Sequence, residues 1–479
     1  MNDQTKSFSP ALGLAVVLVC ASVGVATAIA PVAGALVPLA LLILFGLTRL
    51  KRPALILFIA FLVIQDPLLF FVGGPDSGAG YIIKRLDELF LFLMAAWILV
   101  TNRTAQRSIG ATKLGVCIAC TFLAMGVSTV LRGVHWQPSL MDMLLFSKPF
   151  LLFALGASVV TERDELRNGL RIALPLMLGV VVFAVVFLVA PSLQESYLGD
   201  MRDIDQRLGM NSAQGFFDGP GPYSWFCAAT FAVAYAAYLS FGKNRYLYSA
   251  ITAATFAVLS WRRKSIGGIV AMVLIATLIK AGRDSASRRR AVAVLVLGIV
   301  LGISILTPIV VSLWQYTVHE YGGDPNSIAR VALHYTSFLI AKDYFPFGTG
   351  FGTFGSYASS VYYSEVYAQY GLTEVWGLTP DHPAFITDTF WPMVMGQGGI
   401  AGLVPYVAFF VILLRTTWRA ARSSASNDED RFLSAFTLFV LVASLLESTS
   451  SHIYDTSMQS AFVMIPAGMA WTRFRTRAA

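Results

Sequence analysis

The chain has 479 residues, of which 56% are hydrophobic and 13% are charged, and its mean hydropathy is +0.67. A soluble globular protein carries about 25% charged residues, so this composition excludes that class and indicates repeated passage through a membrane. The formal charge of +8 does not indicate nucleic-acid binding, because the Lys and Arg residues gather in alternate loops, as the positive-inside bias dictates.

Apolar runs recur along the whole chain and predict an all-α polytopic membrane protein with about fourteen transmembrane helices. The expected spans are 9–30, 31–48, 53–72, 86–101, 114–131, 143–160, 172–190, 223–241, 247–260, 265–280, 291–313, 392–414, 432–447 and 457–472. This pattern predicts three regions: transmembrane helices with short loops over 1–313, a large outward loop domain over 314–391, and C-terminal transmembrane helices over 392–479.

The orientation follows from the basic residues. With the amino terminus in the cytoplasm, most of the 35 Lys and Arg residues fall in inward segments. The long outward segment from about Trp314 to Trp391 is then large enough to form a small domain outside the membrane. Its amphipathic stretch Ile328–Ala341 predicts a surface helix. Cations that remain on the outward side are unusual and need an explanation.

The segment Trp261-Arg262-Arg263-Lys264-Ser265 is a very short outward connection with three cations. A guanidinium presents a planar fork that matches a phosphate, and the low dielectric near a membrane strengthens such pairing. We therefore expect Arg262, Arg263 and Lys264 to bind an anion, most simply a lipid phosphate. The alternative is that 247–260 is not a span and that the cluster is an ordinary cytoplasmic anchor, but this would place the basic Arg288–Arg290 outside.

Two other outward arginines are candidates for the same anion. Arg207 lies shortly before the span at 223–241, and Arg330 lies in the expected surface helix. Each arginine by itself is better explained as a solvated charge, but both are well placed to reach an anion held by the first cluster.

His382 is the candidate base on the outward side, because an imidazole accepts a proton from a hydroxyl near neutral pH. Asp381 is its neighbour in the sequence and Asp388 follows six residues later, just before a span. Either carboxylate could orient the ring. The alternative is an exposed loop histidine with no chemical role.

The outward loop also contains a glycine-rich and a tyrosine-rich segment. Gly348-Thr349-Gly350-Phe351-Gly352 has no strand and helix around it, so we expect a tight turn with close backbone packing rather than a nucleotide site. Tyr357, Tyr362 and Tyr363 fit a sugar-binding face, since flat amphipathic rings cover pyranoses. An aromatic belt at the membrane interface explains them equally well.

Taken together, the motifs between Arg207 and Gly402 resemble the superfamily of bacterial O-antigen ligases and O-antigen polymerases. The matching features, in order, are an outward arginine before a span, a serine–arginine motif, an arginine helix, a proline–glycine–glycine signature, and a histidine before a glycine-rich span. Here they are Arg207, Ser260-Trp261-Arg262-Arg263, Arg330, Pro346–Gly352, and His382 with Gly396-Gln397-Gly398-Gly399. Pro383 stands where the family usually has asparagine after the histidine.

The resemblance implies a metal-independent glycosyltransferase of the C-type membrane fold, without a cofactor, in the bacterial inner membrane with its active site facing the periplasm. Its donor would be a glycan on undecaprenyl pyrophosphate. It would contact membrane lipids, and its protein partners would be a chain-length regulator or export proteins. Arg207, Arg262, Arg263 and Arg330 would hold the pyrophosphate, and His382 would deprotonate the acceptor. Thr387–Pro392 resembles exopolysaccharide polymerases more than ligases.

Three functions remain open from the sequence. A polymerase would join lipid-linked repeat units of a surface polysaccharide, whereas an O-antigen ligase would move finished glycan onto lipid A-core. A flippase for lipid-linked oligosaccharides would need charged residues along a central path, and Lys148 is nearly alone within the expected spans.

Overall fold

The computed structural model describes residues 51–71, 78–101, 112–159, 163–198, 206–207, 210–281, 329–423 and 427–478. The chain divides into two compact units, Met1–Trp97 and Ile98–Ala479. The first unit contains α3 (Lys51–Phe71) and most of α4 (Gly78–Thr101). Within this unit the rings of Phe58 and Phe90 are stacked, with their centroids 4.6 Å apart.

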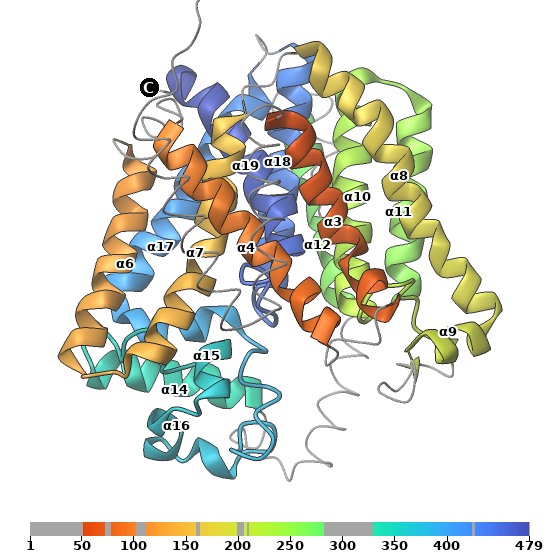
Figure 1. The fold of residues 1–479 in the computed structure, drawn as a ribbon. Helices are drawn as coiled ribbons and strands as arrows, with labels where there is room; N and C mark the ends of the chain where they lie inside the picture. Colours follow the sequence, from red (N-terminus) through yellow and green to blue (C-terminus); the bar gives the residue numbers. More distant parts are fainter. Residues whose placement is uncertain are drawn as a thin grey trace, which may run out of the picture. The chain divides into compact units, whose positions relative to one another are not determined.

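The second unit contains the remaining described elements (Figure 1). Its helices are α6 (Lys113–Leu131), α7 (Trp136–Ser158), α8 (Arg163–Val189), α9 (Pro191–Leu198), α10 (Pro220–Phe241), α11 (Asn244–Leu259), α12 (Arg263–Ala281), α14 (Ala329–Asp343), α15 (Tyr357–Val361), α16 (Glu365–Gln369), the 3₁₀ turn η3 (Leu372–Glu374), α17 (Phe390–Arg422), α18 (Asp428–Glu447) and α19 (Ser457–Ala478). A two-residue strand pair, β1 (Gln206–Arg207) and β2 (Met210–Asn211), is antiparallel.

The described chain is predominantly helical, as the sequence predicts. Each expected span inside the described residues coincides with a helix, whereas 9–30, 31–48 and 291–313 lie outside them. Within the described ranges, five helices (α6, α7, α8, α10 and α17) are long and apolar enough to cross a membrane. The boundaries differ at both ends of helices: α7 begins at Trp136, α8 begins at Arg163 and α17 continues to Arg422, because each helix extends into polar residues beyond its apolar run.

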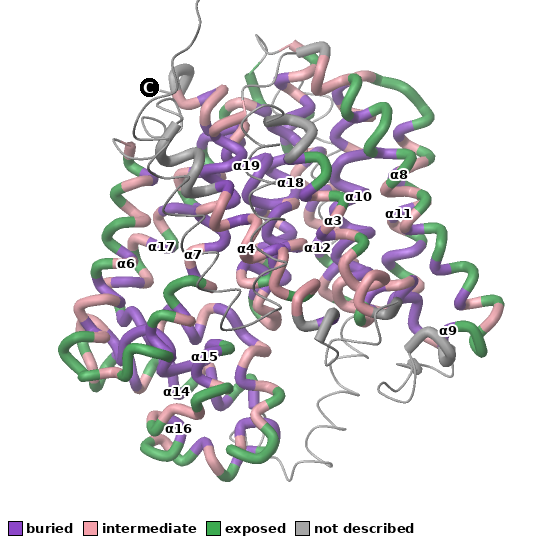
Figure 2. The backbone as a smooth tube through the Cα atoms, in the orientation of Figure 1, coloured by how far each residue is buried: buried purple, intermediate pink, exposed green. Residues whose placement is uncertain are grey.

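Burial separates central from peripheral helices (Figure 2). In the apolar windows of α10 and α7, 78% and 61% of residues are buried, whereas the figure is 28% for both α6 and α8. The exposed residues of α6 include Leu123 and Val130, and those of α8 include Leu176. Large apolar side chains on an outer helix face would be costly in water, so these faces fit contact with lipid.

Local sequence signals explain several helix ends. Thr112 caps α6 by accepting a hydrogen bond from the Gly115 amide, and Asn427 caps α18 by accepting one from the Asp430 amide. Pro220 opens α10 in its first turn, where a missing N–H costs nothing, and Gly242 closes α10 with φ of 67°.

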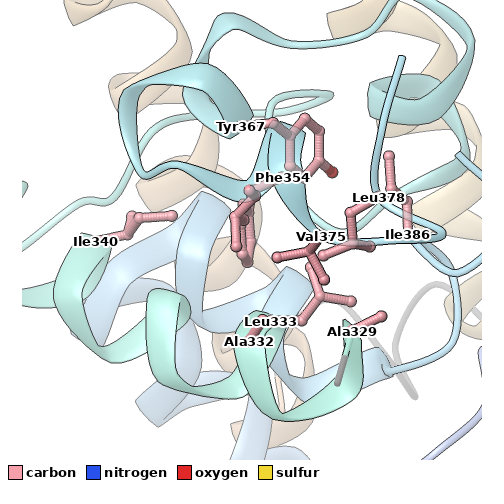
Figure 3. Packing of buried hydrophobic residues seen from close by; sticks show 10 residues of the cluster. Ala329, Ala332, Leu333, Ile340, Phe354, Tyr367, Val375, Leu378 and Ile386 are labelled. Atoms are coloured by element: carbon pink, nitrogen blue, oxygen red, sulfur yellow. The ribbon is translucent and has the colours of Figure 1, made fainter. Parts of the chain in front are cut away.

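Residues 329–389 form an outer lobe, defined by α14, α15, α16, η3 and the segments between them. This outer lobe lies at the end of the second unit where α6 turns into α7 (Figure 1). It has a core of its own, in which α14 packs against residues from the rest of the lobe (Figure 3). The core residues are Ala329, Ala332, Leu333, Ile340, Phe354, Tyr367, Leu372, Val375, Leu378 and Ile386. The helix expected at 328–341 is therefore found as α14.

The outer lobe is joined to the membrane helices through a break in α17. Gly399, inside α17, has φ of 58° and ψ of −161°, which is not helical. Backbone groups near the break bond to the glycine-rich segment of the lobe: Thr349 N donates to Gly396 O and Gly350 N to Gln397 O, both at 2.9 Å. Ala401 N in turn donates to Pro346 O at 3.0 Å. The glycine-rich segment thus supplies hydrogen-bond partners to backbone groups of α17 that lack helical partners at the break.

The glycines of this segment are required for two reasons: a side chain would clash with neighbouring backbone, and the backbone conformation disfavours other residues. A Cβ on Gly348 would lie 2.6 Å from Gly399 N, and one on Gly350 would lie 2.7 Å from the Cα of Thr129 in α6. Both residues also have positive φ, which disfavours a side chain. The predicted tight turn with close backbone packing is confirmed.

Candidate anion site

The cation cluster forms the turn between α11 and α12 and the first turn of α12. Ser260 closes α11, Trp261 has φ of 55°, and α12 begins at Arg263. Arg263 is exposed and Arg262 is partly buried. The first turn of a helix offers unsatisfied N–H groups and the positive end of the helix dipole, so this position favours an anion.

Lys264 is held by groups of the protein itself. Its Nζ lies 3.3 Å from Glu447 Oε1 and donates to Ser450 O at 2.8 Å. Ser265 Oγ donates to Glu447 Oε2 at 3.5 Å and lies 2.6 Å from Ser224 Oγ in α10. The start of α12 is thereby tied to the end of α18 and to α10.

The backbone that follows Arg207 is hydrogen-bonded to the end of α11, next to the turn that carries the cation cluster. Arg207 pairs with Met210 between β1 and β2, and Ala213 N donates to Leu259 O at 3.0 Å. The segment after Arg207 is therefore attached to the last turn of α11, immediately before the cation cluster.

Arg330 forms an ion pair with Asp388. The guanidinium donates from Nε at 3.0 Å and from an Nη at 2.7 Å, both to Asp388 Oδ2. The two residues come from the start of α14 and from the segment just before α17. The Arg330 side chain remains 54% exposed, so the pair leaves it accessible to a ligand.

His382 lies on the exposed side of the outer lobe. Its backbone N–H donates to Thr379 Oγ1 at 3.1 Å, and both His382 and Asp381 are exposed. Among the described residues, no hydrogen bond or ion pair joins the His382 side chain to Asp381 or Asp388. The structure thus brings Asp388 to Arg330 and not to the histidine that it was expected to orient.

The three candidate tyrosines divide into two kinds. Tyr357 and Tyr362 are exposed. Tyr363 is partly buried, its hydroxyl donates to Leu378 O at 2.7 Å, and its ring packs on Tyr367. Burial raises the pKa of Tyr363. Tyr363 is therefore engaged in the packing of the lobe, and Tyr357 and Tyr362 are the rings open to a ligand.

A histidine that the sequence did not single out is held in a polar network. His452, between α18 and α19, places Nδ1 2.6 Å from Asp455 Oδ2 and Nε2 2.8 Å from Thr389 O. Burial lowers the pKa of His452, but the hydrogen bond and charge of Asp455 outweigh it, so the net pKa is raised. The sequence signal was a run of polar residues from Glu447 to His452 between two apolar runs.

Asp142 is a second group that the sequence did not single out. It is 2% exposed, lies in α7, and its Oδ2 accepts a hydrogen bond from Gly352 N at 2.9 Å. The carboxylate therefore holds the glycine-rich segment against α7. An acidic residue at the first turn of an apolar run was the available signal.

The described residues contain no group of three His, Cys, Asp or Glu side chains arranged to hold a metal ion. Cys117 and Cys120 in α6 are not joined by a disulfide. The side chains that the described site offers for chemistry are arginine, imidazole and carboxylate groups.

Comparison with models of known protein families found no match, and comparison with curated proteins found no similar protein. The fold and the site therefore define the protein only as a helical membrane protein with a cationic site beside an outer lobe.

Proposed function

We propose that the protein is a glycosyltransferase that polymerises a bacterial surface polysaccharide, either an exopolysaccharide or O-antigen. It transfers a glycan from undecaprenyl pyrophosphate to the acceptor sugar of another lipid-linked repeat unit. In this proposal the chain crosses the inner membrane fourteen times with a C-type fold, and its site faces the periplasm. No metal takes part.

The observation that supports this proposal most is a continuous series of contacts between the two groups of cations. Lys264 contacts Ser450, Ser448 Oγ accepts from Trp391 Nε1 at 3.0 Å, and Asp388 pairs with Arg330. The start of α12 and the start of α14 are therefore linked through the segment after α18 and the beginning of α17. A diphosphate carries several charges and is bound best by more than one cation, so a structural link between the two groups of arginines supports a shared diphosphate site.

The proposed reaction is a direct displacement. Arg207, Arg262, Arg263 and Arg330 bind the pyrophosphate and stabilise the charge that develops on it. The acceptor hydroxyl attacks the anomeric carbon, a new glycosidic C–O bond forms, and the bond from that carbon to the pyrophosphate oxygen breaks. His382 takes the hydroxyl proton. The products are a longer lipid-linked glycan with inverted linkage and undecaprenyl pyrophosphate.

The exposure of His382 fits this role better than burial would. An acceptor sugar on a growing chain arrives from the periplasm, and a base on the exposed side of the lobe can meet it there. Apo hydrogen-bond geometry does not exclude a base, because catalytic contacts often tighten only when substrate binds.

The test uses purified protein in lipid nanodiscs with lipid-linked repeat units. Wild-type protein is expected to lengthen the chains, and Arg263→Ala to reduce the rate about 10²-fold or more, because it removes charge from the leaving-group site. Lys342→Ala is the matched control, since Lys342 is an exposed cation at the end of α14, and it should retain wild-type activity.

Full activity of Arg263→Ala would refute the role of the cation cluster. Transfer to lipid A-core alone would identify a ligase instead of a polymerase. Movement of the lipid-linked oligosaccharide across the bilayer without any product would identify a flippase.

A further inference from the structure

The segment that connects α18 to α19 is not an ordinary solvent-facing loop. Glu447 at its start is 5% exposed, and Ser448, Ile453 and Tyr454 are fully buried. Every side chain from residue 447 to residue 452 carries a hydroxyl or an ionisable group. Buried polar groups are stable only when they are bonded to partners, so the identity of the partners indicates what the segment does.

The first partner is the start of α12. Glu447 receives the Lys264 ammonium at 3.3 Å and the Ser265 hydroxyl at 3.5 Å. The Lys264 ammonium also donates to the backbone of Ser450 at 2.8 Å. Lys264 and Ser265 follow directly after Arg263, so these contacts fix the turn that carries the arginines.

The second partner is the segment before α17. The His452 ring bridges two groups that only accept hydrogen bonds, the Asp455 carboxylate and the Thr389 carbonyl. Both ring nitrogens must therefore carry a proton, and His452 is an imidazolium ion. Thr389 directly follows Asp388, the residue that binds Arg330.

We infer that residues 447–455 are a positioning segment of the anion site, in which Glu447 fixes the arginine turn at the start of α12 and His452 fixes the Asp388–Arg330 pair. The inference rests on the proposed function. It assigns to Lys264 a positioning role through Glu447, in place of the direct contact with pyrophosphate that the sequence suggested.

The geometry favours positioning over direct binding for both residues. A protonated His452 with both N–H groups engaged has no nitrogen left to accept a proton, so it does not act as the base. The Lys264 ammonium is compensated by a carboxylate that is 6% exposed in its side chain. Separating either pair would leave a buried charge without its partner.

Among the described residues, the charged groups around His452 come from two elements. Asp455 lies on the same segment, and Asp142 of α7 adds its negative charge to the environment of the ring. Lys148 of α7 donates to the backbone oxygen of Asp455 at 3.3 Å. Both carboxylates raise the pKa of His452, so the imidazolium keeps its proton to a higher pH than an ordinary histidine and loses it as the pH rises further.

The first experiment is a double-mutant cycle on transfer kinetics in nanodiscs. Glu447→Gln and Lys264→Met alone should each raise KM for the lipid-linked donor about 10-fold, because each leaves the charge of the remaining partner uncompensated. The double variant Lys264→Met/Glu447→Met should return KM to within about 3-fold of wild type, since removal of both members of a buried pair is often tolerated. Asp428→Asn, at the opposite end of α18, is the control.

A double variant as impaired as Lys264→Met alone would overturn the inference, because it would show that the ammonium itself contacts the donor. Single variants with wild-type KM would also overturn it. If these single variants are normal while Arg263→Ala is inactive, the positioning segment fails but the proposed function stands. Absence of transfer by the wild-type protein would overturn both.

The second experiment uses the pH profile, which a purely structural role would not change. Wild-type KM should rise as the pH rises through the raised pKa of His452, because deprotonated His452 would present a lone pair to one of its acceptors. His452→Gln should raise KM at neutral pH and remove this dependence. An unchanged pH profile in His452→Gln would overturn the assignment of His452.

Discussion

The outer lobe has two sides that differ in burial and in bonding. The glycine-rich segment Pro346–Gly355 is largely buried, with its backbone bonded to α17, α6 and α7. The exposed side carries Trp376, Asp381 and His382, although Gly377 and Leu378 in the same stretch are buried. The first side determines where the lobe stands on the helices, and the second leaves reactive side chains open to a substrate. Different residues thus attach the outer lobe to the helices and remain accessible to a substrate.

The largest effect on stability is expected on the buried side, for Gly348→Ala. Its Cβ would meet the backbone of α17, with Gly399 N at 2.6 Å, and its φ is 74°. Overpacking costs about 1–3 kcal/mol and the positive φ about 1–2 kcal/mol more. The midpoint of thermal unfolding in detergent should fall strongly.

Gly371→Ala is the matched control for this change. Gly371 has φ of 68°, but no atom lies within 4 Å of the point that its Cβ would occupy, so only the conformational cost of about 1–2 kcal/mol applies. Equal destabilisation by the two variants would show that the contact with α17 contributes nothing.

An intermediate effect is expected for Tyr367→Phe. The Tyr367 hydroxyl accepts a hydrogen bond from Gly355 N at 2.8 Å and lies 2.7 Å from Ser359 Oγ. Removing it leaves a buried N–H without a partner, which costs about 1–3 kcal/mol. Tyr362→Phe changes an exposed ring and should stay within about 0.5 kcal/mol. A denaturation midpoint for Tyr367→Phe that equals that of Tyr362→Phe would contradict the role of this hydroxyl.

The smallest effect on stability is expected on the exposed side, for His382→Ala. An exposed side chain away from the core changes stability by less than about 0.5 kcal/mol. Transfer should nevertheless fall about 10²–10⁴-fold, the usual contribution of a general base. Unchanged transfer would remove His382 from the mechanism, whereas a matching loss of stability would show that its role is structural.

The sequence predicted the helices well because each is recorded in a local pattern of apolar residues. It also predicted that Gly348 and Gly350 serve close packing, since a glycine run without a surrounding strand and helix has few other uses. Helix boundaries were less accurate, as Trp136 and Arg163 illustrate, because a membrane helix continues into polar residues at its ends.

The partners within the site could not be predicted from the sequence. Glu447 and Lys264 are separated by many residues, and only the packing of α12 beside α18 makes them neighbours. Asp388 was expected near His382 because the two are close in sequence, yet Arg330, on α14, reaches it in the structure. Side-chain contacts between elements depend on the tertiary arrangement, and the hydropathy pattern does not contain that information.

The interruption of α17 at Gly399 has a consequence for the design of truncated proteins. Pro346 and Gly350 complete the hydrogen bonding of a membrane helix, and that helix supplies the carbonyl groups that the loop needs. Neither part satisfies its backbone hydrogen bonds alone. A fragment that contains only the outer lobe would leave the N–H groups of the glycine-rich segment without their acceptors in α17. A protein without the lobe would leave α17 with unsatisfied backbone groups near Gly399. Swapping this lobe between related proteins would therefore require exchanging the first half of α17 with it.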